Sequence, residues 1–174
     1  MLINRQSRGF TIIELLLVVV ILGVLLTLGF PSFRQVLLNY QIRALAESIS
    51  NGLQVARANA VQRNENVQFI LAADAAWVVK TESAGTVIQT RPAAESSSVL
   101  TVDIEPASAT MVTFSGLGRV TSPDDSINTI NIDVPTSVMP ASDSKDLRIR
   151  ILPGGLIRMC DPNITSSTDV RICP

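Results

Sequence analysis

The sequence has 174 residues (18.7 kDa), of which 47% are hydrophobic and 17% are charged, so it can bury a core and is too apolar for a disordered chain. It contains no histidine, which excludes a Ser-His-Asp triad, a His-ligated zinc and a histidine proton shuttle. The net charge of −1 and the pI near 5.4 exclude a generally basic nucleic-acid-binding surface, although not a local basic patch.

An almost wholly aliphatic run, FTIIELLLVVVILGVLLTLGF, covers residues 10–30 and carries one charge. Its length matches the roughly 20 residues that a helix needs to cross about 30 Å of hydrocarbon. Arg5 and Arg8 precede it and no acidic residue does, so the positive-inside rule places the N-terminus in the cytoplasm. We therefore predict a single-pass anchor in the bacterial inner membrane, with the remaining chain in the periplasm.

A cleaved secretory signal peptide is the alternative interpretation of this N-terminus. The apolar core of a signal peptide usually has only about 7 to 15 residues and ends at a small-residue cleavage site. Residues 29–33, GFPSF, contain no such site. This comparison favours an anchor that stays with the protein.

Glu14 places a carboxylate inside the apolar run. A carboxylate at the membrane centre costs about 2.5 to 3.5 kcal/mol, so Glu14 either reaches the membrane face or has a function that needs a partner. The surrounding residues 8–15, RGFTIIEL, combine a basic leader, a Gly-Phe junction and an acid at the fifth position after the glycine. This pattern resembles the type III signal of type IV pilin-like proteins.

That resemblance implies a specific processing and assembly chemistry. A prepilin peptidase would cut the 1–9 leader after Gly9 and methylate the new N-terminus at Phe10. Glu14 would then neutralise the N-terminal amine of a neighbouring subunit in a filament, and a carboxylate suits a cation at low dielectric. Pro31 lies where pilin helices often carry a proline, which would kink the helix. The implied partners are other pilins or pseudopilins, the peptidase and the inner membrane, with no cofactor or metal.

Residues 31–63 continue the helical pattern as an amphipathic segment. Apolar residues recur every three to five positions on one face: Phe33, Leu37, Tyr40, Leu45, Ile49, Leu53, Ala56 and Ala60. The other face is polar: Arg34, Gln41, Arg43, Glu47, Gln54, Arg57 and Arg63. Gly52 weakens the prediction by about 1 kcal/mol relative to alanine. We expect one helix over 10–63, about 80 Å long at 1.5 Å per residue, whose second half packs on a globular head.

Two segments within this helix, ALAE at 44–47 and LQVARANAV at 53–61, indicate which branch of the family the sequence resembles. They are similar to the pseudopilin H and FimT/FimU group of minor pilins. The fold implied is the α+β pilin fold, in which a long N-terminal helix packs on a β-rich periplasmic head.

From Val67 the apolar pattern alternates, and turn residues recur about every ten positions. Nine strands are predicted: Val67 to Leu71, Ala76 to Lys80, Thr86 to Thr90, Val99 to Ile104, Met111 to Phe114, Gly118 to Thr121, Ile127 to Val134, Leu147 to Leu152 and Leu156 to Cys160. Residues 153–155, PGG, read as a hairpin turn. We therefore expect one β-rich head over 64–174, with Trp77 and Tyr40 as core or interface anchors.

Residues 114–119, FSGLGR, contain glycines that could belong to a phosphate loop. The segment lacks the Lys-Ser/Thr ending and no helix follows it, so a turn between strands is the better interpretation. A Gly-Arg turn is common at this point in the pseudopilin H group.

Paired catalytic carboxylates, a Cys-base pair and metal-ligand clusters are also missing from the sequence, so an enzyme is not expected.

Cys160 and Cys173 are the only cysteines. In an oxidising compartment an even pair indicates a disulfide, and closing so short a loop stabilises the fold by about 3 kcal/mol. Two free buried thiols are the alternative. The bond favours a pilus over a secretion system, because the resemblance implies that minor pilins often close their C-terminal loop in this way while secretion pseudopilins often do not.

Three functions remain open: a minor pilin of a type IV pilus, the H-type pseudopilin of a type II secretion system, and a DNA-binding minor pilin of natural transformation. The resemblance implies a Gly-Arg-x-Arg motif for DNA capture, but residues 155–158 read GLIR. The candidate DNA-binding cations are Arg148, Arg150, Arg158 and Arg171. Residues 145–174 have a net charge of only +2, and residues 64–144 one of −7, which is weak support for phosphate binding. The pilus assignment is therefore preferred.

Overall fold

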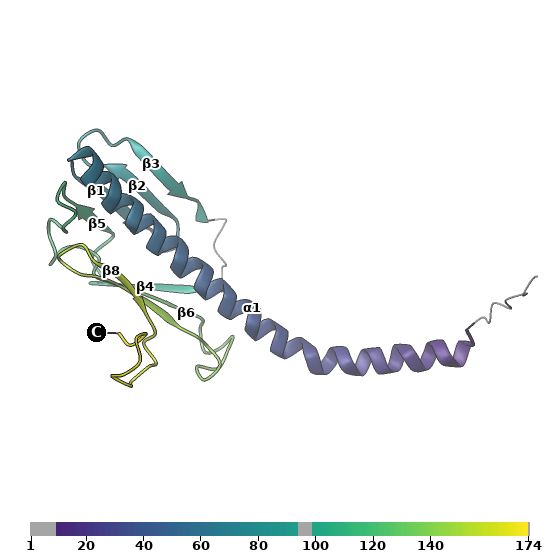
Figure 1. Ribbon diagram of the computed structural model, residues 1–174. Coiled ribbons are helices and arrows are strands. Elements are labelled where there is room, and N and C mark those ends of the chain that lie inside the picture. Colours follow the sequence, from purple (N-terminus) through teal and green to yellow (C-terminus); the bar gives the residue numbers. More distant parts are fainter. Residues whose placement is uncertain (1–9, 94–98, 174) are drawn as a thin grey trace, which may run out of the picture. The chain divides into compact units, whose positions relative to one another are not determined.

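The protein is described here by a computed structural model that covers residues 10–93 and 99–173. It contains two compact units, one ending at Val36 and the other beginning at Leu37. A single helix, α1 (Ile12–Arg63), contributes to both units (Figure 1). The helix starts two residues later than predicted and ends at the predicted residue. The predicted 1–9 leader lies outside the described residues.

The first unit consists of the start of α1. Thr11 caps the helix, because its hydroxyl accepts a hydrogen bond from the Glu14 amide (3.3 Å) and its carbonyl accepts one from the Leu15 amide (3.1 Å). Every large apolar side chain from Phe10 to Leu26 is more than half exposed within this chain. Helical backbone continues through Pro31.

Among the described residues, no helix is both long enough and apolar enough to cross a membrane. The span predicted over 10–30 therefore stays a prediction and is taken up again with the function.

The second unit combines the rest of α1 with two antiparallel four-stranded sheets. The first sheet has the strand order β3-β2-β1-β5, with β1 (Val67–Leu71), β2 (Trp77–Thr81), β3 (Val87–Arg91) and β5 (Met111–Phe114). The second sheet has the order β4-β6-β7-β8, with β4 (Thr101–Glu105), β6 (Thr129–Asp133), β7 (Leu147–Ile151) and β8 (Ile157–Cys160). Strand boundaries mostly differ from the predicted ones by one or two residues. This is the predicted α+β class.

Gly118 to Thr121 does not form the predicted strand. Val120 makes one isolated bridge to Phe114, and the segment before it is a turn in which the Gly118 amide donates to the Ser115 carbonyl (2.7 Å). Gly118 has a φ of +73°, which a strand does not allow. The predicted hairpin turn at 153–155 is confirmed by the bond from the Gly155 amide to the Leu152 carbonyl (2.7 Å).

The second half of α1 buries one face against both sheets. Its buried apolar residues are Leu38, Ile42, Leu45, Ala46, Ile49, Leu53, Ala56 and Ala60. The prediction was wrong at its N-terminal end, where Phe33, Leu37 and Tyr40 are exposed. Adjacent helical residues differ by about 100° in direction, so Leu38 faces the core and Leu37 does not. Trp77, in contrast, is buried and packs on Phe69 with ring centroids 5.7 Å apart.

Gly52 lies where α1 closely approaches two aromatic rings of the first sheet. A Cβ at this position would lie 2.8 Å from Phe69 Cε2 and 3.2 Å from Trp77 Cδ2. The glycine that weakened the helix prediction is thus the residue that lets the helix approach these two buried rings. Packing against the sheet outweighs the lower helix propensity of glycine.

Candidate functional site

The predicted processing and assembly residues lie at the start of the described chain. Gly9 is outside the described residues, and Phe10 is 84% exposed. Glu14 stands in the first turn of α1 among exposed aliphatic side chains. Within residues 10–93 and 99–173, its carboxylate has no ion-pair partner. A carboxylate in such surroundings is chemically suited to pair with a cation supplied by another chain.

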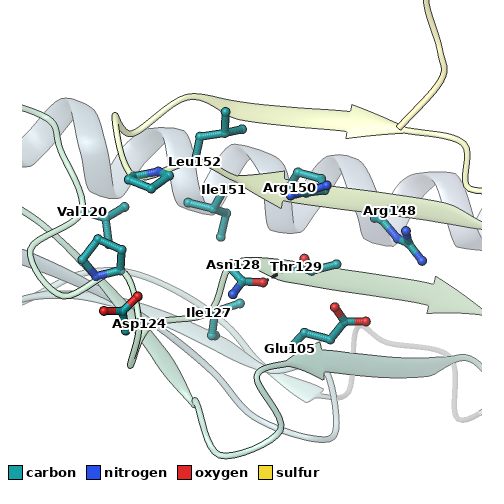
Figure 2. A pocket seen from close by; sticks show the side chains of 12 residues that line it. Glu105, Val120, Asp124, Ile127, Asn128, Thr129, Arg148, Arg150, Ile151 and Leu152 are labelled. Atoms are coloured by element: carbon teal, nitrogen blue, oxygen red, sulfur yellow. Dashed lines mark hydrogen bonds between the residues drawn. The ribbon is translucent and has the colours of Figure 1, made fainter. Parts of the chain in front are cut away.

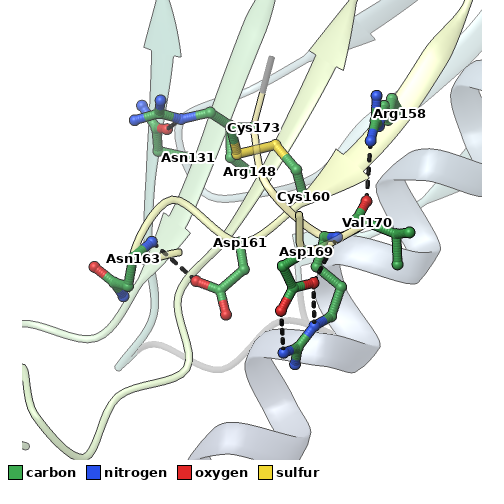
Figure 3. Close-up of a disulfide and its surroundings, with 10 residues drawn as sticks. Asn131, Arg148, Arg158, Cys160, Asp161, Asn163, Asp169, Val170 and Cys173 are labelled. Carbon is green, nitrogen blue, oxygen red and sulfur yellow. Dashed lines mark hydrogen bonds and ion pairs between the residues drawn. A yellow bond between two sulfur atoms is a disulfide. The ribbon is translucent and has the colours of Figure 1, made fainter. Parts of the chain in front are cut away.

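The predicted disulfide joins Cys160, at the end of β8, to Cys173 (Figure 3). It closes a loop with a sequence separation of 13, so the alternative of two free thiols is wrong. The loop is held further by the Asp161 amide, which donates to the Arg171 carbonyl (2.8 Å). Within the loop, hydrogen bonds from Arg171 lower the pKa of Asp169 to about 2.

Three of the four predicted cations share one face of the second sheet. Arg150 on β7 is paired with Arg158 on β8, and Arg148 lies two residues along the same strand. Arg148 Nε donates to Asn131 Oδ1 (2.6 Å), and Asn131 Nδ2 donates in turn to Glu105 Oε1 (3.2 Å). A row of hydrogen bonds therefore leads from an arginine to a carboxylate across three strands.

The remaining contacts of these cations also lie within the chain. Arg158 Nη2 donates to the Val170 carbonyl (2.9 Å), and Arg171 pairs with Asp169 at 2.8 Å on the C-terminal loop.

A hollow of about 400 Å³ adjoins this face (Figure 2). Its lining includes Arg148 and Arg150, but also the carboxylates of Glu105 and Asp124. A polyanion would meet both signs of charge here, and Arg171 is not part of the lining. The arrangement does not favour DNA binding.

A pair of carboxylates that the sequence analysis did not single out lies beside the C-terminal loop. The Ser144 hydroxyl donates to Asp133 Oδ1 (3.3 Å) and lies within hydrogen-bond distance of Asp146, which also accepts a bond from Asn163 Nδ2 (3.2 Å). Burial and the neighbouring Asp146 raise the pKa of Asp133. Burial opposes the ionisation of Asp146, but hydrogen bonds from Asp133, Ser144 and Asn163 outweigh it and lower its pKa.

The two glycine motifs of the sequence, FSGLGR at 114–119 and PGG at 153–155, lie in contact with each other next to α1. Arg57 Nε donates to the Gly118 carbonyl (3.1 Å), and a Cβ at Gly155 would lie 1.8 Å from that same oxygen. The Val120 amide also donates to the Pro153 carbonyl (3.1 Å). Arg57 was expected on the solvent face of the helix, but it is half-buried and ties α1 to the turn at 115–118. No sequence period relates residues so far apart, so sequence analysis could not find this contact.

Comparison with known proteins gives two family matches and a structural one. A family described as type II transport protein GspH matches residues 45–155, and the prokaryotic N-terminal methylation motif matches residues 4–30. Two crystal structures of the type IV minor pilin FimU of Pseudomonas aeruginosa (strain PAO1), in space groups P21 and P65, are similar to this fold.

The structural match is one of fold. The TM-scores are 0.51 and 0.50 at 15% and 16% identity, covering 69% and 67% of this chain and 88% and 90% of the FimU chains. No curated protein matches the sequence.

Proposed function

The chain belongs to the GspH family, and from this membership we propose that it is a minor pilin of a type IV pilus that primes assembly or forms part of the tip. Family, methylation motif and fold together make it a minor pilin or pseudopilin. The observation that carries the proposal is their order along one chain: a methylation motif at 4–30, then a GspH match at 45–155, which spans the end of α1 and strands β1 to β7.

The choice of a pilus rests on the C-terminal disulfide and on the FimU-like fold. The Cys160–Cys173 bond closes the loop in the way that the resemblance leads us to expect of minor pilins. FimU, which has a similar fold, is a type IV minor pilin. The alternative is the H-type pseudopilin of the type II secretion system, which the description of the matched family favours. DNA capture is not favoured, because the candidate arginines are engaged within the chain or accompanied by carboxylates.

The proposed location is the inner membrane, with residues 10–30 as the anchor and the head in the periplasm. The methylation motif and the family support this location. The exposed aliphatic surface of residues 12–26 supports it too, because a surface of this kind requires lipid or other apolar helices around it. Catalysis is not part of the proposal, since family and fold are those of structural pilins.

Intact mass spectrometry of the membrane-extracted protein tests the processing step. We expect loss of residues 1–9 and one methyl group on the amine of Phe10. A mature N-terminus beyond residue 30 would mean an ordinary signal peptide and would refute the proposal.

A pair of variants tests the assembly step. Glu14→Ala should insert in the membrane at least as well as the wild type, because a buried charge is removed, but should fail to enter filaments. Glu47→Ala is the matched control, because Glu47 pairs with Arg43 at the exposed helix surface and should have no effect. If Glu14→Ala enters filaments at the wild-type level, the assigned role of Glu14 is wrong.

A strain that lacks the gene distinguishes the pilus from the secretion system. Loss of surface pili in this strain supports the pilus, whereas loss of secreted proteins with pili intact supports the secretion alternative.

A further inference from the structure

The contact between Gly118 and Gly155 carries exposed apolar side chains on its solvent side. Leu117 is 82% exposed, Leu156 is 55% exposed and Val61, at the end of α1, is 52% exposed. A Cβ at Gly118 would lie 3.0 Å from Val61 Cγ2, so the helix end and the two turns adjoin each other. We call Val61, Leu117 and Leu156 the apolar platform.

The backbone under the platform is held firmly. Gly118 and Gly155 both have positive φ, +73° and +81°, and no side chain fits between them. The bond from Arg57 to the Gly118 carbonyl ties the same point to the helix. The leucines therefore project from turns whose position is fixed, which lowers the entropy lost when a partner binds them.

The fold itself does not require leucine at these places. Turn positions favour Gly, Asn, Asp and Ser, because glycine adopts positive φ and the polar side chains hydrogen-bond to the backbone of the turn. Leu117 stands between two glycines in such a turn, and Leu156 directly follows Gly154 and Gly155. Single exposed leucines are ordinary, but several exposed large apolar residues at points where fixed backbone segments adjoin one another indicate an interaction site.

A hollow of about 610 Å³ lies beside the platform and shares Val61 and Leu156 with it. The other residues that line it are Gln54, Arg57, Ala58, Gln62 and Ile157. Arg57 is the one charged residue of this lining, and its Nε already donates to the Gly118 carbonyl. Four of the seven lining residues, Ala58, Val61, Leu156 and Ile157, are apolar, so apolar contact contributes most of what an occupant of this surface can gain.

The size of the platform restricts what can bind there. Its side chains expose on the order of 300 Å², well below the roughly 800 Å² per partner of a stable protein complex. The occupant must therefore be held nearby by a second contact. The proposed function supplies one, because in a filament the aliphatic surface that residues 12–26 of α1 expose would pack with other subunits.

We propose that the apolar platform docks an apolar segment of a neighbouring subunit in the same filament. This inference rests on the proposed function and deepens it by naming the surface of the head that contacts the neighbour. It also gives the two glycine motifs a role, namely to hold Leu117 and Leu156 in place beside the end of α1.

The test replaces the platform leucines in the full-length chain, in its own cells. The variant is Leu117→Asn with Leu156→Asn, and the matched control is Val170→Asn, because Val170 is 84% exposed on the disulfide loop and outside the platform. We expect the double variant to fall at least tenfold in the purified filament fraction and the control to stay at the wild-type level. Equal incorporation of the double variant would overturn the inference. Absence of the wild-type chain from the filaments would overturn the proposed function as well.

A photo-crosslinking amino acid at position 156 identifies the occupant. We expect a crosslink to an apolar segment of another filament subunit, whereas the same group at position 170 should give none to that segment. A crosslink to lipid alone, or no crosslink in assembled filaments, would overturn the inference. The double variant should still reach the membrane, and the fluorescence of its buried Trp77 should match that of the wild type, which shows that the head has folded.

Discussion

The close approach of α1 to the first sheet predicts that Gly52→Ala destabilises the protein, although alanine is the better helix former. The added Cβ would lie 2.8 Å from Phe69 Cε2, closer than two carbon atoms approach without overlap. Phe69 is fully buried and Trp77 is 3% exposed, so neither ring has free space to move into. The helix or the rings must therefore shift.

Two opposing magnitudes decide the sign of the effect. Alanine in place of glycine stabilises a helix interior by about 1 kcal/mol. Overpacking a well-filled core costs about 1 to 3 kcal/mol. The overlap is with ring atoms of a fixed aromatic pair and not with the end of a flexible chain, so the cost lies in the upper part of that range. We expect a net loss of about 1 to 2 kcal/mol, a fall in Tm of about 3 to 8 °C.

Trp77 reports this change directly, because it is the only tryptophan and touches the altered position. Unfolding of the full chain in detergent is followed by its fluorescence. Gly154→Ala is the control, since a Cβ there meets nothing within 4 Å, and its stability should stay within about 0.5 kcal/mol of the wild type. A Gly52→Ala protein as stable as the wild type, or more stable, would show that helix and sheet do not approach as described.

Two further predictions concern the C-terminal half of the head. Replacing Cys160 and Cys173 together by serine should lower the free energy of unfolding by about 3 kcal/mol under non-reducing conditions, and full alkylation of the unreduced wild type would contradict the bond. Asp133→Asn should raise the stability of the folded protein at pH 7, because the raised pKa of Asp133 means that folding favours its protonated form, which asparagine imitates beside ionised Asp146. The gain in stability should vanish below about pH 4, where the Asp133 side chain of the wild type is protonated and therefore as neutral as asparagine. An equal gain for Asp125→Asn would contradict this explanation, because it would show that removing any negative charge has the same effect.

Local pattern was sufficient for much of the fold. The helical period predicted α1 to within two residues of its start, and alternation predicted β1 and β5 at their observed boundaries. The disulfide followed from the number of cysteines and the compartment. The helix and the strands depend on residues that are close in sequence, and two cysteines can form only one intramolecular pair.

Features that depend on which distant residue a side chain contacts were harder to predict. The exposed Tyr40 and the buried Leu38 lie on neighbouring stretches of one helix, and only the position of the sheets decides which of them is covered. The same applies to Arg148, which alternation placed correctly on a strand but whose bond to Asn131 depends on the register of β6 and β7. The sequence thus predicts where the arginines lie on the strands, but not whether their side chains are engaged by other residues of the chain.

The two glycine motifs illustrate how a tertiary contact changes the meaning of a sequence pattern. Taken alone, Gly118 is a turn glycine, and Gly155 is the glycine of a hairpin or of an incomplete DNA-binding motif. Together they bring a carbonyl oxygen to where any Cβ would overlap it at 1.8 Å. This overlap explains the glycines completely but places no demand on the residue beside each of them. That both neighbours are leucine, and that both are exposed, is explained by the docking of a neighbouring subunit that we propose for this surface.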